Sequence, residues 1–237
     1  MRIVFATSEA NPYIKSGGLA DVLGSLPKAL VQKGHECIVV LPKYQDMKLA
    51  ETLEYVASYD IWVGWRKCYC GVFTAKHDGV TYYFIDNEQY FRRPGLYGYD
   101  DDNERFAFFD FAVLELMSHV DIKPDILHLH DWQTAMIATL YKERYAYYEY
   151  YQGIKIVFTI HNIAYQGKCD PKLLSDHFGL DNYLYYNGNC RNDGCFNMMK
   201  AAIYYSDVVT TVSPTYAQEI LTDSFGEGLQ SILQDRK

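Results

Sequence analysis

Residues 3–41 read IVFATSEANPYIKSGGLADVLGSLPKALVQKGHECIVVL. This stretch opens with a continuous apolar run, Ile3 to Thr7, and closes with another, Cys37 to Leu41; each is typical of a strand buried on both faces. Between them, apolar residues recur at helical spacing from Leu19 to Leu30. Strand, loop, helix and strand in this order predict a parallel βαβ unit.

The same alternation returns in the second half of the chain. Strands are predicted at 126–129, 154–160 and 208–212, and helices at 104–119, 132–145 and 196–205. Ser213 and Pro214 suit the start of a final helix, and Pro27 is expected to kink or restart the first one. The pattern predicts an α/β fold with a doubly wound parallel sheet.

The region from Leu53 to Asp86 has a different character. Segments of alternating polarity are separated by Arg66-Lys67 and by Asp78-Gly79, which predicts an inserted region of strands and hairpins. No linker or repeat divides residues 1–237, so we expect one domain.

Composition narrows the function classes. The chain has 237 residues, 49% of them hydrophobic, and a net charge of -8, so it can bury a core and disfavours nucleic acid and anionic membranes as partners. The N-terminus MRIVFATSEA is no signal peptide, and a cytoplasmic location is expected. The six cysteines form no CxxC pair and have no histidine at ligand spacing, so we expect reduced thiols and no metal. The 23 tyrosines suit either sugar binding or ordinary packing.

Polar motifs follow the predicted strands, where ligands bind in such sheets. The first is KSGGLADV, Lys15 to Val22. Gly17 and Gly18 allow close approach of a ligand to the backbone, the helix start favours an anion, and Lys15 supplies a cation. The alternative is an ordinary turn with a solvated lysine. The loop matches neither a dinucleotide fingerprint nor a P-loop.

The other motifs are DILHLHDWQTAM, from Asp125, and FTIHNIAYQG, from Phe158. In the first, His128, His130 and Asp131 are candidates for a metal site, whereas a packed His128 and a helix-capping Asp131 are the structural alternative. In the second, the side chains of His161 and Asn162 can hydrogen-bond sugar hydroxyls, and Tyr165 can pack on a sugar ring; a simple turn is the alternative.

In their order and spacing, these motifs, together with YFRRPGLYG, DNERFAFF and SDVVTTVSPTYAQEI, resemble the glycogen/starch synthase family of retaining glucosyltransferases. The resemblance covers nearly the whole chain. It implies a Rossmann-like N-terminal half of a GT-B glycosyltransferase, on the acceptor side. It further implies that the C-terminal nucleotide-binding domain is absent from residues 1–237 and that this chain alone has little transferase activity.

The resemblance also implies a reaction and its residues. Glucose would pass from ADP-glucose to the non-reducing end of an α-1,4-glucan, with no cofactor. Lys15, Gly17 and Gly18 would bind the donor, and Asp131 and His161 would lie at the reacting glucose. The remaining contacts to sugar and acceptor would come from Asp21, Tyr90, Asn162 and Tyr165, with Phe91 as an alternative to Tyr90.

Two other functions compete with this one. The chain could be a stand-alone glucan-binding module without catalysis, or a metal hydrolase that uses His128, His130 and Asp131. The coding sequence downstream of residue 237 would distinguish a glucan-binding module from half of a glucosyltransferase. Metal analysis of the purified protein would test the hydrolase.

Overall fold

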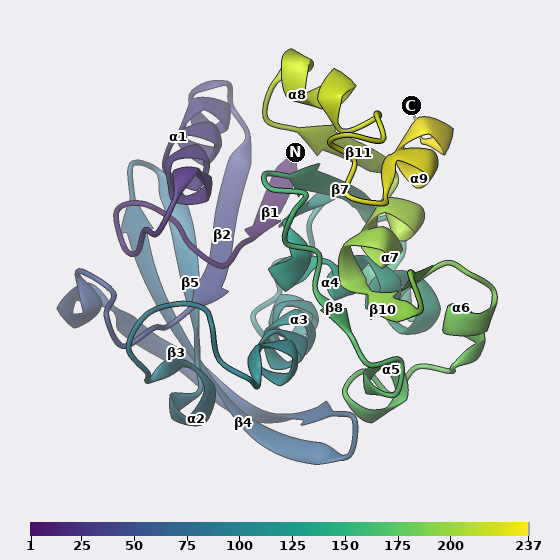
Figure 1. The fold of residues 1–237 in the computed structure, drawn as a ribbon. Coiled ribbons are helices and arrows are strands. Elements are labelled where there is room, and N and C mark those ends of the chain that lie inside the picture. The colour runs from purple at the N-terminus through teal and green to yellow at the C-terminus, as the bar shows by residue number, and fades with distance from the viewer. Residues whose placement is uncertain (237) are drawn as a thin grey trace.

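The computed structural model describes residues 1–236, and an eight-stranded sheet forms its centre (Figure 1). The strand order is β11-β7-β6-β1-β2-β5-β4-β3, and the six strands from β11 to β5 run parallel. The sheet strands are β1 (Arg2–Ala6), β2 (Glu36–Pro42), β3 (Glu54–Val63), β4 (Arg66–His77), β5 (Val80–Asp86), β6 (Ile126–His130), β7 (Lys155–Ile160) and β11 (Val208–Thr211). The parallel sheet predicted from the alternating pattern is confirmed.

Helices connect the parallel strands and cover both faces. They are α1 (Gly18–Gln32), α2 (Glu88–Phe91), α3 (Asp102–His119), α4 (Met136–Leu140), α5 (Leu173–Asp176), α6 (Tyr183–Tyr186), α7 (Met198–Tyr205), α8 (Pro214–Glu219) and α9 (Gln230–Asp235). Right-handed crossovers put α1, between β1 and β2, on one face. The chain then moves the opposite way across the sheet, which puts α3, α4 and α7 together on the other face. No helix among residues 1–236 is long and apolar enough to cross a membrane.

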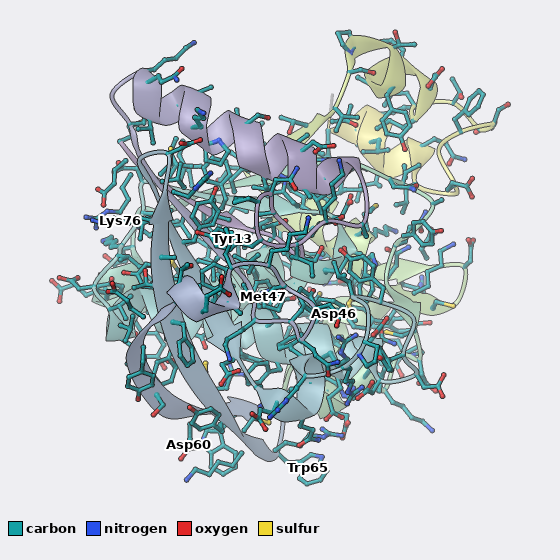
Figure 2. All side chains as sticks on the ribbon, turned by 90° about the vertical axis from the view of Figure 1, so that its left-hand side faces the viewer. Tyr13, Asp46, Met47, Asp60, Trp65 and Lys76 are labelled. Atoms are coloured by element: carbon teal, nitrogen blue, oxygen red, sulfur yellow. The ribbon has the colours of Figure 1, made fainter. Side chains whose placement is uncertain are left out.

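The hairpins predicted between Leu53 and Asp86 are confirmed, but their strands extend the main sheet rather than forming a separate insertion. β4 pairs antiparallel with β3 and β5, but β5 also pairs parallel with β2 and so belongs to the parallel core. The tip of the β3–β4 hairpin docks on α5, where Trp65 Nε1 donates to Asp176 Oδ1 at 3.0 Å. Figure 2 shows Lys76 at the left and Trp65 at the bottom, close to the two ends of β4.

Two helix predictions have different outcomes. The expected restart at Pro27 is wrong, because α1 continues through this residue as one helix; the expected kink stays a prediction. Pro27 is buried, and packing of α1 against β2 and β5 outweighs one lost backbone hydrogen bond. The predicted start of α8 is confirmed: Ser213 caps it by accepting from Tyr216 N at 3.0 Å, and Pro214 is its first residue.

Three tyrosines of the run at 141–151 are buried and pack the chain, whereas Tyr147 and Tyr148 are exposed. Tyr141 donates to the carbonyl oxygens of Tyr151 and Ile154, at 2.9 and 3.1 Å. Tyr145 donates to Glu115 on α3 at 2.6 Å, and Tyr151 donates to the Leu114 carbonyl. These hydroxyls therefore tie the segment after α4 to α3.

A smaller sheet lies beside α7. It has the order β8-β10-β9, with β8 at Lys168–Cys169, β9 at Arg191–Asn192 and β10 at Cys195–Asn197. Asn197 ends this sheet and caps α7 by accepting from Lys200 N at 2.9 Å. The segment between β7 and β8 contains His161, Asn162 and Tyr165 of the motif FTIHNIAYQG. The small sheet therefore anchors one side of the candidate site.

Candidate functional site

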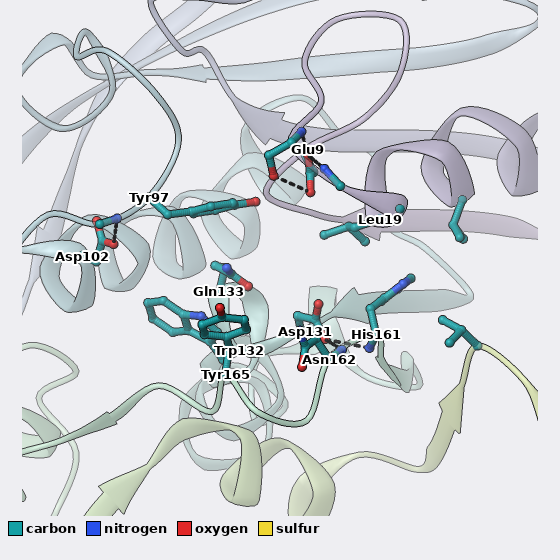
Figure 3. A pocket seen from close by; sticks show the side chains of 16 residues that line it. Glu9, Leu19, Tyr97, Asp102, Asp131, Trp132, Gln133, His161, Asn162 and Tyr165 are labelled. Carbon is teal, nitrogen blue, oxygen red and sulfur yellow. Dashed lines mark hydrogen bonds between the residues drawn. The ribbon is translucent and has the colours of Figure 1, made fainter. Parts of the chain in front are cut away.

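A cavity of about 810 Å³ opens beyond the carboxyl ends of β1, β6 and β7 (Figure 3). Its position is the one that open parallel sheets use for ligands. In Figure 3, Glu9, Leu19 and Tyr97 lie on one side, and Asp131, Trp132, His161 and Tyr165 face them from the other. The cavity is lined by Glu9, Ser16, Gly17, Gly18, Leu19, Val22, Tyr97, Gly98, Asp102, Asp131, Trp132, Gln133, His161, Asn162, Tyr165 and Val212.

Glu9 occupies the glycine loop at the start of α1. The side chain is 3% exposed, and its Oε2 accepts from the backbone N–H of Ser16 and, at 3.2 Å, from that of Gly17. Oε1 accepts from the Ser16 hydroxyl at 3.1 Å. The expectation that these N–H groups are open to an anion is therefore met only in part, because Glu9 already satisfies two of them.

Replacing Glu9 with glutamine is expected to lower the free energy of unfolding by about 1–3 kcal/mol. The amide oxygen can still accept from both N–H groups, but without the charge these hydrogen bonds in a buried site are no longer charge-assisted and become weaker. Urea unfolding measures the change. Glu36→Gln is the matched control, because the exposed Glu36–Arg2 ion pair should contribute under about 1 kcal/mol. Equal losses in the two variants would show that Glu9 does not hold the loop.

Lys15 and Asp21 pair with each other at the rim of the cavity. Lys15 Nζ lies 2.8 and 2.7 Å from the two carboxylate oxygens of Asp21, and Asn11 Nδ2 donates to the same carboxylate at 2.6 Å. Neither Lys15 nor Asp21 lines the cavity, and both side chains are about half exposed. This ion pair competes with the binding of a phosphate by Lys15 and of a sugar hydroxyl by Asp21.

Asp131 joins the ends of β6 and β7. Its Oδ1 accepts from the backbone N–H groups of His161 and Asn162, at 2.7 and 3.2 Å. The helix-capping alternative is wrong, because no side-chain capping bond forms at the turn Trp132–Thr134. The backbone of Asp131 lies at φ 59° and ψ -176°, a region that costs about 1–3 kcal/mol for a residue other than glycine. Strain at the carboxyl end of a central strand is typical of a functional position.

Burial raises the pKa of Asp131 to about 7, even though the two backbone N–H donors lower it; nearby Glu9 raises it further. The cavity lining contains three carboxylates and no lysine or arginine. A protonated Asp131 reduces this negative charge near neutral pH, and it can donate a hydrogen bond to a ligand oxygen.

Three histidines lie close together at the ends of β6 and β7, and of these only His161 lines the cavity. The rings of His128 and His130 stack with centroids 4.3 Å apart, and His130 Nδ1 lies 2.9 Å from His161 Nε2. His128 Nε2 bonds the Thr159 hydroxyl at 2.7 Å. Burial lowers the pKa of His128 and His161 to about 4 and that of His130 well below its usual range, so all three are neutral near pH 7.

Aromatic rings form the opposite end of the cavity. Trp132 packs edge-on against Phe106 with centroids 5.3 Å apart, and Tyr165 is 67% exposed. Both residues also line an adjoining cavity of about 330 Å³, together with Gly167 and Lys168. Flat rings that line two neighbouring cavities suit a ligand built of successive sugar rings.

Tyr90 is the predicted site residue that lies away from the cavity. It is 2% exposed, its hydroxyl donates to Glu104 at 2.6 Å, and its ring packs at a tilt against Phe108. Phe91 is buried as well. Of the other predicted residues, the fold brings Gly17, Gly18, Asp131, His161, Asn162 and Tyr165 together around one cavity.

Sequence reasoning did not single out Glu9, Tyr97 or Gln133. Glu9 follows the first strand and could have been found by the same strand-end rule that identified Lys15. Tyr97 lies in the loop where only Tyr90 and Phe91 were considered, and its hydroxyl is 2.7 Å from Ser8 Oγ. The spacing along a loop does not reveal which aromatic ring turns inward.

No cluster of three or more His, Cys, Asp or Glu within residues 1–236 is arranged to hold a metal ion. His128 bonds Thr159, and His130 bonds His161. The carboxylate of Asp131 is engaged by backbone N–H groups. These three side chains therefore do not converge as the metal-hydrolase alternative requires.

Comparisons with known proteins agree with this architecture. The family model described as "Starch synthase catalytic domain" matches residues 2–235. Glycogen synthases of Lactobacillus acidophilus and Clostridium botulinum are 49% and 50% identical over 99% and 100% of this chain. Each match covers 50% of the relative, so the chain spans about half the length of the curated relatives it matches.

Two solved structures are also similar. The catalytic domain of starch synthase IV from Arabidopsis thaliana, bound to ADP and acarbose, superposes with a TM-score of 0.91 at 36% identity, over 99% of this chain and 49% of that one. Sucrose-phosphate synthase from Thermosynechococcus elongatus has a TM-score of 0.51 at 11% identity, over 92% of this chain and 44% of that one. The second likeness concerns the fold alone.

Proposed function

The chain belongs to the family of starch synthase catalytic domains, and on that premise we propose that its cavity binds glucose during glucosyl transfer to an α-1,4-glucan. The observation that carries the proposal is the pairing, in one cavity, of a glycine loop at a helix start with Asp131, His161 and Asn162. The first group suits the phosphate end of a sugar nucleotide, and the second suits sugar hydroxyls.

ADP-glucose is the proposed donor. The starch synthase from Arabidopsis was solved with ADP, which favours adenine over uracil as the base. Gly17 and Gly18 let the backbone approach the diphosphate, and Lys15 would exchange Asp21 for a phosphate oxygen. Because the cavity lining itself holds no lysine or arginine, the remaining positive charge must come from outside this set of residues.

The glucan acceptor is proposed to run along Trp132 and Tyr165 into the adjoining cavity. Its terminal hydroxyl would then lie beside Asp131, His161 and Asn162. In the transfer, the bond from the anomeric carbon to the diphosphate breaks, and a bond to the acceptor oxygen forms on the same face. The acceptor proton passes to the leaving phosphate, so no protein base is required.

Incorporation of radiolabelled glucose from ADP-glucose into glycogen tests the proposal, with the protein that contains these residues at its native length. Transfer that depends on ADP-glucose supports it. Glucan binding without any transfer would instead establish the non-catalytic binding module.

Tyr165→Ala is expected to weaken maltooligosaccharide binding by roughly fivefold, since one exposed ring contributes about 1 kcal/mol of stacking. Isothermal titration measures the affinity. Tyr148→Ala is the matched control, because Tyr148 is exposed to the same degree, 65%, and does not line the cavities at Tyr165. An equal loss in both variants, or none in either, argues against a sugar path along Tyr165.

A further inference from the structure

His130 is enclosed in the core directly behind the cavity. It is 0% exposed, and its ring centroid lies 4.3 Å from that of His128 and 6.1 Å from that of Phe5. Nδ1 pairs with His161 Nε2 at 2.9 Å, whereas Nε2 is buried and has no hydrogen-bond partner within residues 1–236. His128 cannot serve Nε2, because its own Nε2 bonds Thr159 and the two rings stack face to face.

A hydrogen bond between two imidazole nitrogens contains one proton, so only two arrangements of a neutral pair are available. In the first, His130 donates from Nδ1, and the proton of His161 must lie on Nδ1. In the second, His161 donates from Nε2, and the proton of His130 must lie on Nε2. The two arrangements differ in which atom remains unpaired in the core.

The first arrangement leaves a bare lone pair at His130 Nε2, and the second leaves a buried N–H without an acceptor. Orphaned N–H groups are rarer in folded proteins than under-satisfied acceptors, because the desolvated donor has no compensation. Deep burial of all three rings also disfavours a charged pair. The core therefore favours donation from His130.

We propose that His130 is a positioning residue that holds His161 as the tautomer protonated on Nδ1. His161 Nδ1 bonds no other residue among 1–236, and the side chain lines the cavity. The neutral ring then presents an N–H donor to the ligand, and its other nitrogen is occupied by His130. In this state His161 is a donor to an oxygen atom and not a general base.

Only one part of this proposal rests on the proposed function. The identity of the oxygen, a sugar hydroxyl, rests on the proposed glucosyl transfer. The tautomer rests only on the geometry of His130 and His161, and it can be read without substrate. Failure of the transfer assay and failure of the tautomer assignment are thus separate results.

The tautomer is measured by two-bond ¹H–¹⁵N correlation spectra of the ¹⁵N-histidine-labelled protein near neutral pH. The chain has seven histidines, and loss of one signal set in His161→Gln assigns the relevant ring. We expect His161 to carry its proton on Nδ1 in roughly tenfold excess. A coupling across the hydrogen bond, with the proton attached to His130 Nδ1, is expected as well. A wild-type His161 protonated mainly on Nε2 overturns the proposal.

Variants separate positioning from general packing. His130→Asn keeps an N–H donor near the place of Nδ1 and should retain the Nδ1 tautomer of His161. His130→Leu removes the donor, and the ratio of the Nδ1 to the Nε2 tautomer of His161 should fall at least fivefold. His77→Gln, at an exposed position on β4, should change nothing. An unchanged tautomer in His130→Leu overturns the role of His130. Should that variant not fold, the coupling across the hydrogen bond in the wild type still decides the donor.

Discussion

Exchanging Asp131 for asparagine is expected to stabilise the protein, relative to the wild type, by about 2–3 kcal/mol more at about pH 8 than at about pH 5. Burial raises the pKa of Asp131 to about 7 in the folded protein, against an ordinary value of 3.8. Between these values the folded state binds a proton that the unfolded state has lost. The stability of the wild type therefore falls as pH rises through this window, whereas asparagine does not titrate.

The hydrogen bonds at Asp131 make asparagine a suitable replacement. Both backbone N–H groups, from His161 and Asn162, donate to the same oxygen, Oδ1, which an asparagine retains. Asparagine also tolerates the positive φ of this position better than most residues. Urea unfolding across the pH range measures the difference between the two proteins, so that the titration of the buried histidines cancels.

Asp207→Asn is the matched control. Burial opposes ionisation of Asp207, but bonds from Ile156 N and Lys142 outweigh it and lower its pKa. The carboxylate is then ionised in both states above about pH 5, so the stability gap of this variant should not change with pH. A flat profile for Asp131→Asn as well would mean that Asp131 is already ionised in the folded protein at pH 5.

Gly167→Ala is expected to lower the free energy of unfolding by about 3 kcal/mol and to weaken glucan binding. Gly167 lies at φ 65°, which costs an alanine about 1–2 kcal/mol. A Cβ here would also lie 2.7 Å from Trp132 Cε3 and 3.1 Å from Met198 Cβ, and overpacking of this kind adds about 1–3 kcal/mol. Relief requires Trp132 to move, and Trp132 lines both cavities.

Gly153→Ala isolates the effect of the backbone angle. Gly153 has φ 88°, and a Cβ there meets no atom within 4 Å. The free energy of unfolding of Gly153→Ala should therefore fall by only about 1–2 kcal/mol, and this variant should bind glucan normally. Chemical unfolding and oligosaccharide titration of the two variants give the comparison. Equal losses of stability in the two variants would show that Trp132 and Met198 move aside for the new Cβ without destabilising the protein.

Much of the fold could be predicted from local patterns. The runs at Ile3 and Cys37 are continuous and apolar because β1 and β2 are buried on both faces, so their period and length reveal them directly. The region from Leu53 to Asp86 was predicted as hairpins, correctly for both β3–β4 and β4–β5. The parallel pairing of β5 with β2 was not predicted, because the sequence of a strand does not show which strand it pairs with.

The candidate site was predictable to a similar extent. The rule that ligands bind at the carboxyl ends of parallel strands brought Gly17, Asp131 and His161 to one edge, and they line one cavity. The inward position of Tyr97 and the burial of Tyr90 were not predictable, since the sequence around them does not show which aromatic ring faces the cavity. The roles of the predicted residues in transfer stay predictions.

The sequence by itself determined the order of strands and helices, the polar motifs at the strand ends and the family, because these features are written in residues that are neighbours along the chain. The tertiary structure alone decided which partners those motifs have. The parallel register of β6 and β7 sets His130 opposite Thr159, and this brings Asp131 and His130 to His161 across about 30 residues. The protonation of Asp131 and the tautomer proposed for His161 depend on those contacts and on burial, which no local pattern contains.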